Sequence, residues 1–267
     1  MGVRCQELYA DLAHLLGGAK AGVMISVIIP TDNEETALPE TLRHLLQQLG
    51  DYEVIVVDGG STDRTGAVLN HFGFEFAPIL IAPDASHFTH HAPRIILTAP
   101  KGRASQMNAG AKHATGEWFL FLHADTQLPD GALARLNALE ADSAIQAGGF
   151  LHRFSGNDWR LRLVSFLDNF RCRHSRIIYG DQAMFVRRSL FERLGGFPDQ
   201  PILEDVAFCE KLIQVVTPVL LSPPVLTDSR KFVKMGIWRS FARVLLIILH
   251  VEFHLPILPR AFFQDIR

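Results

Sequence analysis

Two acidic residues follow apolar runs that are typical of buried β-strands. Asp58 ends the run in VIVVDGGSTDRT, and Asp125 ends the run in WFLFLHADTQLP. A carboxylate at the carboxyl end of a strand lies at the edge of an open α/β sheet where ligands bind. Two such carboxylates in one crevice suit a ligand that carries a diphosphate together with a divalent metal ion.

Asp125 is the predicted metal ligand, because it is the sole carboxylate at the end of its strand. A hard divalent ion on a diphosphate takes few protein carboxylates and leaves its other positions to phosphate and water. His123 stands two residues earlier and would share one face of an extended strand with Asp125. Three roles are open for His123: contact with a ribose, contact with the metal, or packing.

The motif around Asp58 has the residue types of a nucleoside site. Asp58 can accept a hydrogen bond from a base or a ribose, and Gly59 allows close approach of the backbone. Ser61 stands where the next helix begins, so that Ser61 or Thr62 is its expected cap. The alternative for Asp58 is an ordinary acidic strand-to-helix turn.

The first predicted strand ends in PTDNEE, another polar turn at the same edge of the sheet. Pro30, Asn33 and Glu34 belong to this turn. Its amides suit the edge of a uracil-like base, while capping of the following helix explains the same residues equally well.

Basic residues at a predicted helix start suit an anionic diphosphate. Lys101, Arg103 and Gln106 stand in PKGRASQMNAG, where early helix amides also attract anions. Arg230, in the late basic motif SRKFVKMGIWR, is expected to close over the leaving diphosphate. A solvated face or contact with anionic lipid are the alternatives for this late motif.

A second acidic pair, Glu204 and Asp205, stands at the start of a predicted helix. A carboxylate there is stabilised by the helix dipole and can serve as a general base toward an acceptor hydroxyl. Plain N-terminal capping is the competing explanation. Gly180, Asp181 and Gln182, in GDQAMFV, are expected to form the acceptor wall.

The elements that must position these residues alternate along the chain. Strands are predicted at 24–30, 53–58, 94–99 and 117–125, and helices at 34–49, 62–72, 103–113 and 129–139. Such alternation predicts a parallel, helix-covered sheet. After residue 147 the order becomes mixed, with a strand at 148–154, helices at 158–173 and 203–215, a turn that leads into a short strand within 179–188, and short strands near 219 and 226.

Composition indicates a globular protein and excludes several other classes. The 267 residues are 48% hydrophobic and carry a formal net charge of −2, so a core is available and a nucleic-acid partner is not expected. The three cysteines form no CxxC pair, which fits a reducing cytosol. No apolar run reaches membrane-spanning length, and neither GxGxxG nor GxxxxGK[ST] occurs.

Three segments outside these elements have their own predictions. Residues 1–23 form an N-terminal extension that is expected to be helical. The Pro- and His-rich stretch 75–93 is interpreted as an exposed loop, with a short strand at 79–82, rather than a metal cluster of His87, His90 and His91. An apolar helix over 236–255 packs on the core, forms a homodimer contact, or rests on a membrane surface.

The order of these motifs resembles family 2 glycosyltransferases with the GT-A fold. Their pattern is IPxxNEE, VVDxGSxD, an acidic metal motif after a strand, and then ED. The motifs GRASQMNAGA, FLHADT, GDQAMFV and LEDV are similar to the bacterial subgroup of radical-SAM/selenodomain-associated transferases. The resemblance covers Met24 to Trp238, but HAD replaces the common DxD, and the QxxRW of processive synthases is missing.

The resemblance implies a fold and an organisation for the whole chain. A GT-A-like single domain over 24–267 would pair a mostly parallel nucleotide-binding sheet, flanked by helices, with a mixed acceptor-side half. The nucleotide-sugar half would be 24–146, the acceptor half 147–235, and the C-terminal helical segment 236–267.

The resemblance also implies a non-processive, inverting transfer from a nucleotide-diphospho-sugar, with a UDP-sugar as the expected donor. Asp58 and the turn 30–33 would hold the nucleoside, Asp125 would hold Mn²⁺ or Mg²⁺, and Asp205 would deprotonate a hydroxyl of a lipid or small-molecule acceptor. The corresponding location is the cytoplasm, with peripheral contact at the inner face of the membrane as one of the alternatives for the C-terminal helix. The alternatives are a catalytically silent nucleotide-sugar-binding or membrane-surface scaffold and a sugar-phosphate nucleotidyltransferase, which the acidic PTDNEE turn disfavours.

Overall fold

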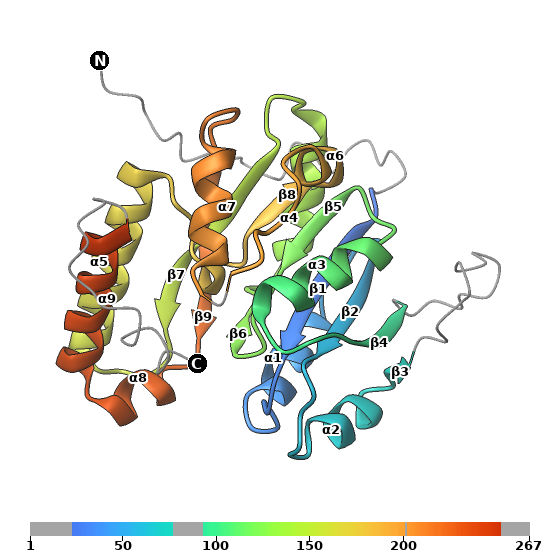
Figure 1. The fold of residues 1–267 in the computed structure, drawn as a ribbon, viewed down its shortest axis with the longest axis horizontal. Helices are drawn as coiled ribbons and strands as arrows, with labels where there is room; N and C mark the ends of the chain where they lie inside the picture. The colour runs from blue at the N-terminus through green and yellow to red at the C-terminus, as the bar shows by residue number, and fades with distance from the viewer. Residues whose placement is uncertain (1–22, 77–92, 201, 252–267) are drawn as a thin grey trace.

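The computed structural model describes residues 23–76, 93–200 and 202–251. Their strands form one mixed sheet in the order β3-β4-β2-β1-β5-β8-β7-β9-β6 (Figure 1). The strands are β1 (Ile25–Thr31), β2 (Tyr52–Asp58), β3 (Glu75–Phe76), β4 (Arg94–Thr98), β5 (Trp118–Phe121), β6 (Thr126–Gln127), β7 (Ala147–Phe154), β8 (Phe185–Arg187) and β9 (Val219–Thr227). The predicted N-terminal helix, the strand at 79–82 and the three-histidine loop lie outside the described residues.

The first half of the sheet is parallel, as predicted from its continuous apolar runs. Strand β1 is buried along its whole length and pairs in parallel with β2 and β5, while β4 pairs in parallel with β2 and β3. The second half is mixed, because β8 runs antiparallel to β5 and β7, and β6 runs antiparallel to β9. This α/β architecture agrees with the predicted fold class.

Helices cover both faces of the sheet and enclose two cores. One core packs α1 (Leu38–Leu45), α2 (Thr65–His71) and α4 (Ala132–Ala138) against one face. The other packs α3 (Arg103–His113), α5 (Trp159–Ser175), α6 (Arg188–Arg193) and α7 (Glu204–Leu212) against the opposite face. Alternate β1 residues supply the two cores, since Val27 and Ile29 belong to the first and Ile28 belongs to the second.

Two predicted elements are shorter in the structure. Helix α1 begins at Leu38, beside Pro39, and ends at Leu45, so Leu49 is 80% exposed instead of lying on the core face. Strand β5 ends at Phe121, and His123 to Asp125 form a turn in which the Thr126 amide donates to the His123 carbonyl. The prediction that Asp125 ends a strand, with His123 on the same strand face, is therefore wrong, because the chain has already left the sheet there.

The C-terminal part of the described chain is helical. Helix α8 (Arg230–Met235), which the sequence analysis did not predict, is followed directly by α9 (Ile237–Val251). The two short strands expected near 219 and 226 are one continuous strand, β9. None of the described helices combines the length and the hydropathy that a bilayer crossing requires.

Candidate active site

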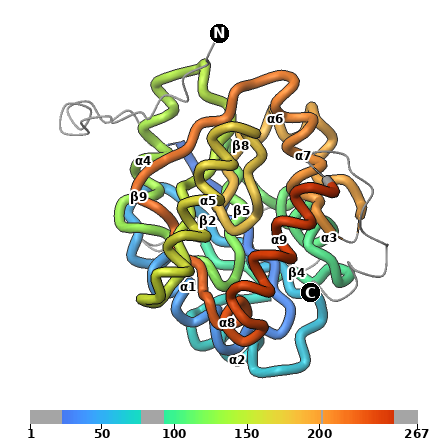
Figure 2. Tube along the Cα trace, turned by 90° about the vertical axis from the view of Figure 1, so that its left-hand side faces the viewer, coloured from blue at the N-terminus to red at the C-terminus, as the bar shows by residue number. Residues whose placement is uncertain are grey.

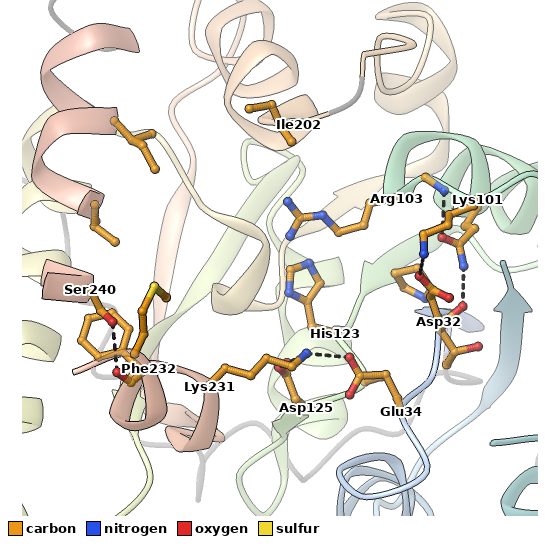
Figure 3. Close-up of a pocket in the computed structure, with 18 of the residues that line it drawn as sticks. Asp32, Glu34, Lys101, Arg103, His123, Asp125, Ile202, Lys231, Phe232 and Ser240 are labelled. Carbon is orange, nitrogen blue, oxygen red and sulfur yellow. Dashed lines mark hydrogen bonds and ion pairs between the residues drawn. The ribbon is translucent and has the colours of Figure 1, made fainter. Parts of the chain in front are cut away.

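A cavity of about 480 Å³ opens at the carboxyl ends of the parallel strands (Figure 3). Its polar end is formed by the loops after β1, β4 and β5 together with the start of α3. Its apolar end is formed by α8, α9 and the segment before α7. The lining residues include Pro30, Thr31, Asp32, Glu34, Lys101, Arg103, Gln106, His123, Asp125, Ile202, Lys231, Phe232, Met235, Ser240, Arg243, Val244 and Ile247.

Two carboxylates face one cation at the polar end. The Lys231 ammonium lies 2.7 Å from Glu34 Oε1 and 3.6 Å from Asp125 Oδ2. Burial raises the pKa of Glu34 above its ordinary value, and the hydrogen bond from Lys231 partly offsets this effect. The contact joins residues 197 positions apart in sequence, so it brings α8 over the loops that carry the two carboxylates (Figure 3).

Oxygen ligands for a divalent ion are therefore present around the Lys231 ammonium. Mg²⁺ and Mn²⁺ accept carboxylate oxygens and keep several positions for water and phosphate. No group of three His, Cys, Asp or Glu side chains with metal-site spacing occurs among the described residues. The pair of Glu34 and Asp125 fits an ion that takes its remaining ligands from a bound diphosphate.

Cations surround the same end of the cavity. Lys101 Nζ lies 2.6 Å from Asp32 Oδ2, and Arg103 Nε lies 2.9 Å from Glu204 Oε1. Glu204 is almost completely buried, so its charge is compensated by Arg103 at the start of α3. This ion pair connects the predicted diphosphate side to the start of α7.

His123, Gly180 and Asp205 are packed against one another beside these cations. A Cβ atom at Gly180 would lie 2.3 Å from His123 Nε2 and 3.4 Å from Asp205 Oδ2, so a larger residue there would displace the His123 ring. The Gly180 amide donates a 2.7 Å hydrogen bond to Asp205 Oδ2. Burial and the nearby Arg103 charge lower the pKa of His123 to about 3, so the imidazole is neutral at pH 7.

Asp181 faces a buried histidine rather than the cavity. His152 Nε2 lies 3.5 Å from Asp181 Oδ2, and His152 Nδ1 lies 3.7 Å from Asp168 Oδ2. Asp181 Oδ1 is buried and accepts no hydrogen bond from the described residues. Burial raises the pKa of Asp181 to about 6, although the neighbouring His152 opposes the shift. Gln182 is fully buried, and its side chain bonds to the Tyr179 amide and the Phe150 carbonyl.

Replacing Asp181 by asparagine is expected to stabilise the protein by about 1–2 kcal/mol at pH 7.5. The folded-state pKa of about 6 lies above the ordinary 3.8, so the native state binds the proton more tightly than the unfolded state. The contribution of Asp181 to the free energy of unfolding therefore falls as the pH rises from about 4 to 6. Asparagine does not ionise, so Asp181→Asn does not lose stability in this pH range. Denaturant unfolding across this range measures the effect.

The control for this prediction is Asp130→Asn, at an exposed carboxylate outside the cluster. Its stability difference from wild type should stay near zero at each pH. An Asp181→Asn difference that stays constant between pH 4 and 7.5 would contradict the assignment.

The residues predicted for the nucleoside divide into two groups, because Pro30 and Glu34 line the cavity whereas Asn33, Asp58 and Ser61 form a hydrogen-bonded turn beside it, outside its lining. Asp58 accepts hydrogen bonds from the Ser61 hydroxyl and amide and from the Gly60 amide. Asn33, at φ 58°, accepts from the amides of Thr62 and Asp63 at 2.8 and 3.2 Å. Asn33 thus caps the loop before α2 instead of its own helix, and Ser61 is not the side-chain cap of α2.

Gln106 connects two strand ends. Its side-chain amide donates to the Thr31 carbonyl at 2.7 Å and to the Val57 carbonyl at 2.8 Å. Gly59 lies against this side chain, since a Cβ atom there would approach Gln106 to 3.1 Å. Gln106 therefore lines the cavity, and its buried side chain connects the ends of β1 and β2 by hydrogen bonds.

Arg230 lies outside the cavity lining and is ion-paired with Asp228, while its neighbour Lys231 points into the cavity. Asp32 was predicted only as part of the turn 30–33, and the apolar end formed by α8 and α9 was not predicted from the sequence. The one signal for this end was the helical spacing of Ser240, Val244 and Ile247, which line the cavity from one side of α9.

Comparisons with known proteins agree with this architecture. A PGL/p-HBAD biosynthesis glycosyltransferase of Mycobacterium bovis (strain BCG / Pasteur 1173P2) is 34% identical over 182 residues, which cover 66% of this chain and 64% of that protein. The matched stretch thus spans less than two thirds of that relative's length. An undecaprenyl-phosphate 4-deoxy-4-formamido-L-arabinose transferase of Enterobacter sp. (strain 638) is 30% identical over 158 residues, 58% of this chain and 41% of that protein.

Solved structures share the fold. A mannosyltransferase from Pyrobaculum calidifontis, in complex with GDP-Man and Mn²⁺, has a TM-score of 0.61 at 25% identity, covering 90% of this chain and 67% of that one. Glucosyl-3-phosphoglycerate synthase from Mycobacterium tuberculosis has a TM-score of 0.56 at 18% identity, covering 86% of this chain and 79% of that one, and supports the fold alone. The family model described as glycosyl transferase family 2 matches residues 26–195. The chain belongs to glycosyl transferase family 2, with the mostly parallel α/β fold of GT-A enzymes.

Proposed function

We propose that this protein is a non-processive, inverting glycosyltransferase that moves a sugar from a nucleotide-diphospho-sugar to a hydroxyl acceptor. The observation that carries the proposal is the polar end of the cavity. There, Asp125 and Glu34 face Lys231, while Lys101 and Arg103 stand at the start of α3. Lys101 and Arg103 are paired with Asp32 and Glu204, so three cations stand among four carboxylates. Carboxylates for a metal ion beside cations for phosphate suit a metal-bound diphosphate.

The donor occupies the polar end of the cavity in this proposal. Asp125 would hold Mn²⁺ or Mg²⁺, with Glu34 beside it, and Lys231 would move from the carboxylates to the diphosphate. When bound, the metal neutralises the negative charge that develops on the leaving nucleoside diphosphate. Lys101 and Arg103 stabilise the same charge. A UDP-sugar remains the expected donor, held through the turn that contains Asp58 and the first-strand turn at Pro30.

Asp205 is the proposed general base. Its carboxylate withdraws the proton of the acceptor hydroxyl as that oxygen attacks the anomeric carbon and the bond to the diphosphate oxygen breaks. The hydrogen bond from the Gly180 amide holds Asp205 Oδ2 in position. Glu204 is not proposed as the base, because its buried carboxylate is ion-paired with Arg103. Its proposed role is to position Arg103.

The acceptor approaches from the apolar end. Phe232, Met235, Val244 and Ile247 line this end, which suits a hydroxyl carried by a lipid or by a small molecule with an apolar part. The subgroup of radical-SAM/selenodomain-associated transferases and a cytoplasmic location remain parts of the proposal that rest on the sequence alone. A homodimer remains an alternative to membrane contact for the C-terminal helix. The three parts into which the chain was divided, 24–146, 147–235 and 236–267, stay a proposal as well.

The second candidate is a catalytically silent scaffold that binds nucleotide sugars. The ion pair between Lys231 and Glu34 favours it in one respect, because it occupies the position where the metal is expected. Turnover separates the two candidates, since a scaffold binds the donor and neither transfers nor hydrolyses its sugar.

Calorimetric titration of UDP, GDP and their sugar conjugates tests the donor site. We expect one nucleotide to bind with Mn²⁺ or Mg²⁺ present and to lose at least about tenfold in affinity with EDTA, because the ion that Asp125 would hold would compensate the charge of the diphosphate. Equal binding with and without metal would contradict the assigned ligand set. Absence of binding to every nucleotide would overturn the proposed function.

A further inference from the structure

Helix α5 carries an exposed apolar stripe that no described element covers. Trp159, Leu163, Phe166 and Phe170 recur at helical spacing, and their side chains are 61, 38, 64 and 54% exposed. The opposite side of α5 supplies buried residues such as Leu161 and Val164, so the helix is apolar on two sides. Soluble proteins rarely expose contiguous apolar surface of this kind unless it meets a partner.

Helix α9 extends the stripe. The rings of Trp159 and Trp238 meet edge to face with centroids 6.1 Å apart. Trp238 is 48% exposed and Leu245 is 45% exposed. Figure 1 shows α5, α8 and α9 together at one end of the molecule, and Figure 2 shows them on the side that faces the viewer. We call this surface the basic apolar face, formed by the exposed side chains of α5, α8 and α9.

The charge of this face differs from that of the rest of the chain. Helices α5, α8 and α9 carry nine Lys and Arg residues and a single acidic residue, Asp168, whereas the whole chain has 26 Lys and Arg against 28 Asp and Glu. Not all nine lie on the face, because Lys231 and Arg243 line the cavity and Arg171 is only 10% exposed. Four of the cations pair with carboxylates at or near the helices. Arg162, Lys234 and Arg239 have no carboxylate at ion-pair distance within the described part of the chain, and all three are exposed.

We propose that the basic apolar face binds the surface of an anionic lipid bilayer, with the aromatic side chains of α5 and α9 inserted among the headgroups and the cations beside the lipid phosphates. Tryptophan, phenylalanine and leucine flanked by Lys and Arg are the residue types that lie at membrane interfaces. Anionic lipid adds electrostatic attraction to the burial of apolar area. The contact needs no metal or nucleotide, so it stands apart from the donor chemistry.

Charge also argues against two other partners. A second copy of the chain would bring two cationic faces together, and like charges in one interface oppose association. Residues 252–267, which follow α9, contain two acidic and two basic residues, so they carry no excess negative charge toward the face.

The position of α9 connects the bilayer with the cavity. Ser240, Val244 and Ile247 line the apolar end of the cavity, while Trp238 and Leu245 belong to the basic apolar face. An acceptor hydroxyl on a membrane amphiphile therefore lies within one helix diameter of the cavity, about 10 Å. This last step rests on the proposed transfer reaction, whereas the membrane contact does not.

Vesicle flotation of the full chain tests the proposal. We expect wild type to float with phosphatidylcholine vesicles that contain phosphatidylglycerol, to bind vesicles of phosphatidylcholine alone much more weakly, and to dissociate at high salt. The variant Phe166→Ser/Phe170→Ser should lose about two orders of magnitude in partition coefficient, because two inserted rings are removed. Arg162→Gln/Arg239→Gln should lose roughly fivefold for each charge.

Matched controls lie elsewhere on the surface. Leu49→Ser/Phe76→Ser removes two side chains that are 80 and 63% exposed, and Lys112→Gln removes an exposed charge of α3. Both controls should float like wild type. All variants should bind the nucleotide as wild type does, which separates failure of the membrane contact from failure of the donor site.

Tryptophan fluorescence gives a second readout. Two of the three tryptophans, Trp159 and Trp238, belong to the face, whereas Trp118 is completely buried in the core. Lipids brominated near the headgroup should quench wild type, and Trp159→Phe/Trp238→Phe should leave an unquenched signal from Trp118. Three results would overturn the proposal: wild type does not float, it floats equally well with neutral vesicles, or Phe166→Ser/Phe170→Ser floats like wild type. A dimer in sedimentation velocity that this variant converts to monomers would also overturn it.

Discussion

Asp125→Ala is expected to abolish metal-dependent donor binding and to reduce sugar transfer by about a thousandfold. The carboxylate is the proposed ligand of the ion on the diphosphate, and the ion supplies several kcal/mol of charge stabilisation. The fold should be unaffected, because the ion pair of Asp125 with the exposed Lys231 contributes little to stability. Calorimetry with the preferred nucleotide and Mn²⁺, followed by a transfer assay, measures both effects.

Asp130→Ala is the matched control, since Asp130 is an exposed carboxylate five residues further along the same loop region. It should bind and react like wild type. A second comparison comes from EDTA, which should reduce wild type to the level of Asp125→Ala and leave the variant unchanged. If Asp125→Ala keeps wild-type affinity for the metal–nucleotide complex, Asp125 is not the ligand.

Asp205→Asn is expected to lower kcat by about 10²- to 10⁴-fold while donor affinity stays close to wild type. In wild type, Asp205 Oδ2 accepts a 2.7 Å hydrogen bond from the Gly180 amide, and Asp205 Oδ1 accepts a 2.8 Å hydrogen bond from the Val206 amide. Asparagine has one oxygen and therefore keeps one of these two hydrogen bonds, while the substitution removes the basic group. Steady-state kinetics give kcat, and calorimetry gives the donor affinity on the same preparation.

Glu204→Gln separates general-base catalysis from a structural effect at the start of α7. Glu204 is paired with Arg103, so this variant is expected to raise KM for the donor more than it lowers kcat. Unchanged kcat in Asp205→Asn would remove Asp205 from the mechanism.

Much of the fold was predictable because its signals are local. Continuous apolar runs predicted the buried parallel strands, and the predicted helix 103–113 coincides with α3. The motif order also placed Lys101, Arg103, His123 and Asp125 at one edge of the sheet, and all four line the cavity. These predictions depend only on period, strand direction and the rule that βαβ strands end at the same edge.

Other features depended on partners far away in sequence. Asn33 looked like a cap for the helix that follows it, yet it bonds to amides of the next βα turn, about 30 residues later. Gln106 looked like a ligand-binding polar residue, yet strand carbonyls of β1 and β2 occupy its amide. In each case the side chain forms hydrogen bonds with backbone groups of another segment. Which backbone groups need such a partner is known only once the strands are paired.

By itself the sequence determined the strand–helix alternation, the parallel half of the sheet, and which acidic and basic residues gather at its carboxyl edge. Only the tertiary structure decided that His123 and Asp125 lie in a turn after β5, that Lys231 reaches Glu34 and Asp125, and that α8 and α9 form the apolar end of the cavity. The physical reason is the range of each interaction. Hydrophobic periodicity is a local property, which can be recognised from the residues of one element. An ion pair between residues 197 positions apart forms only after the intervening chain has packed.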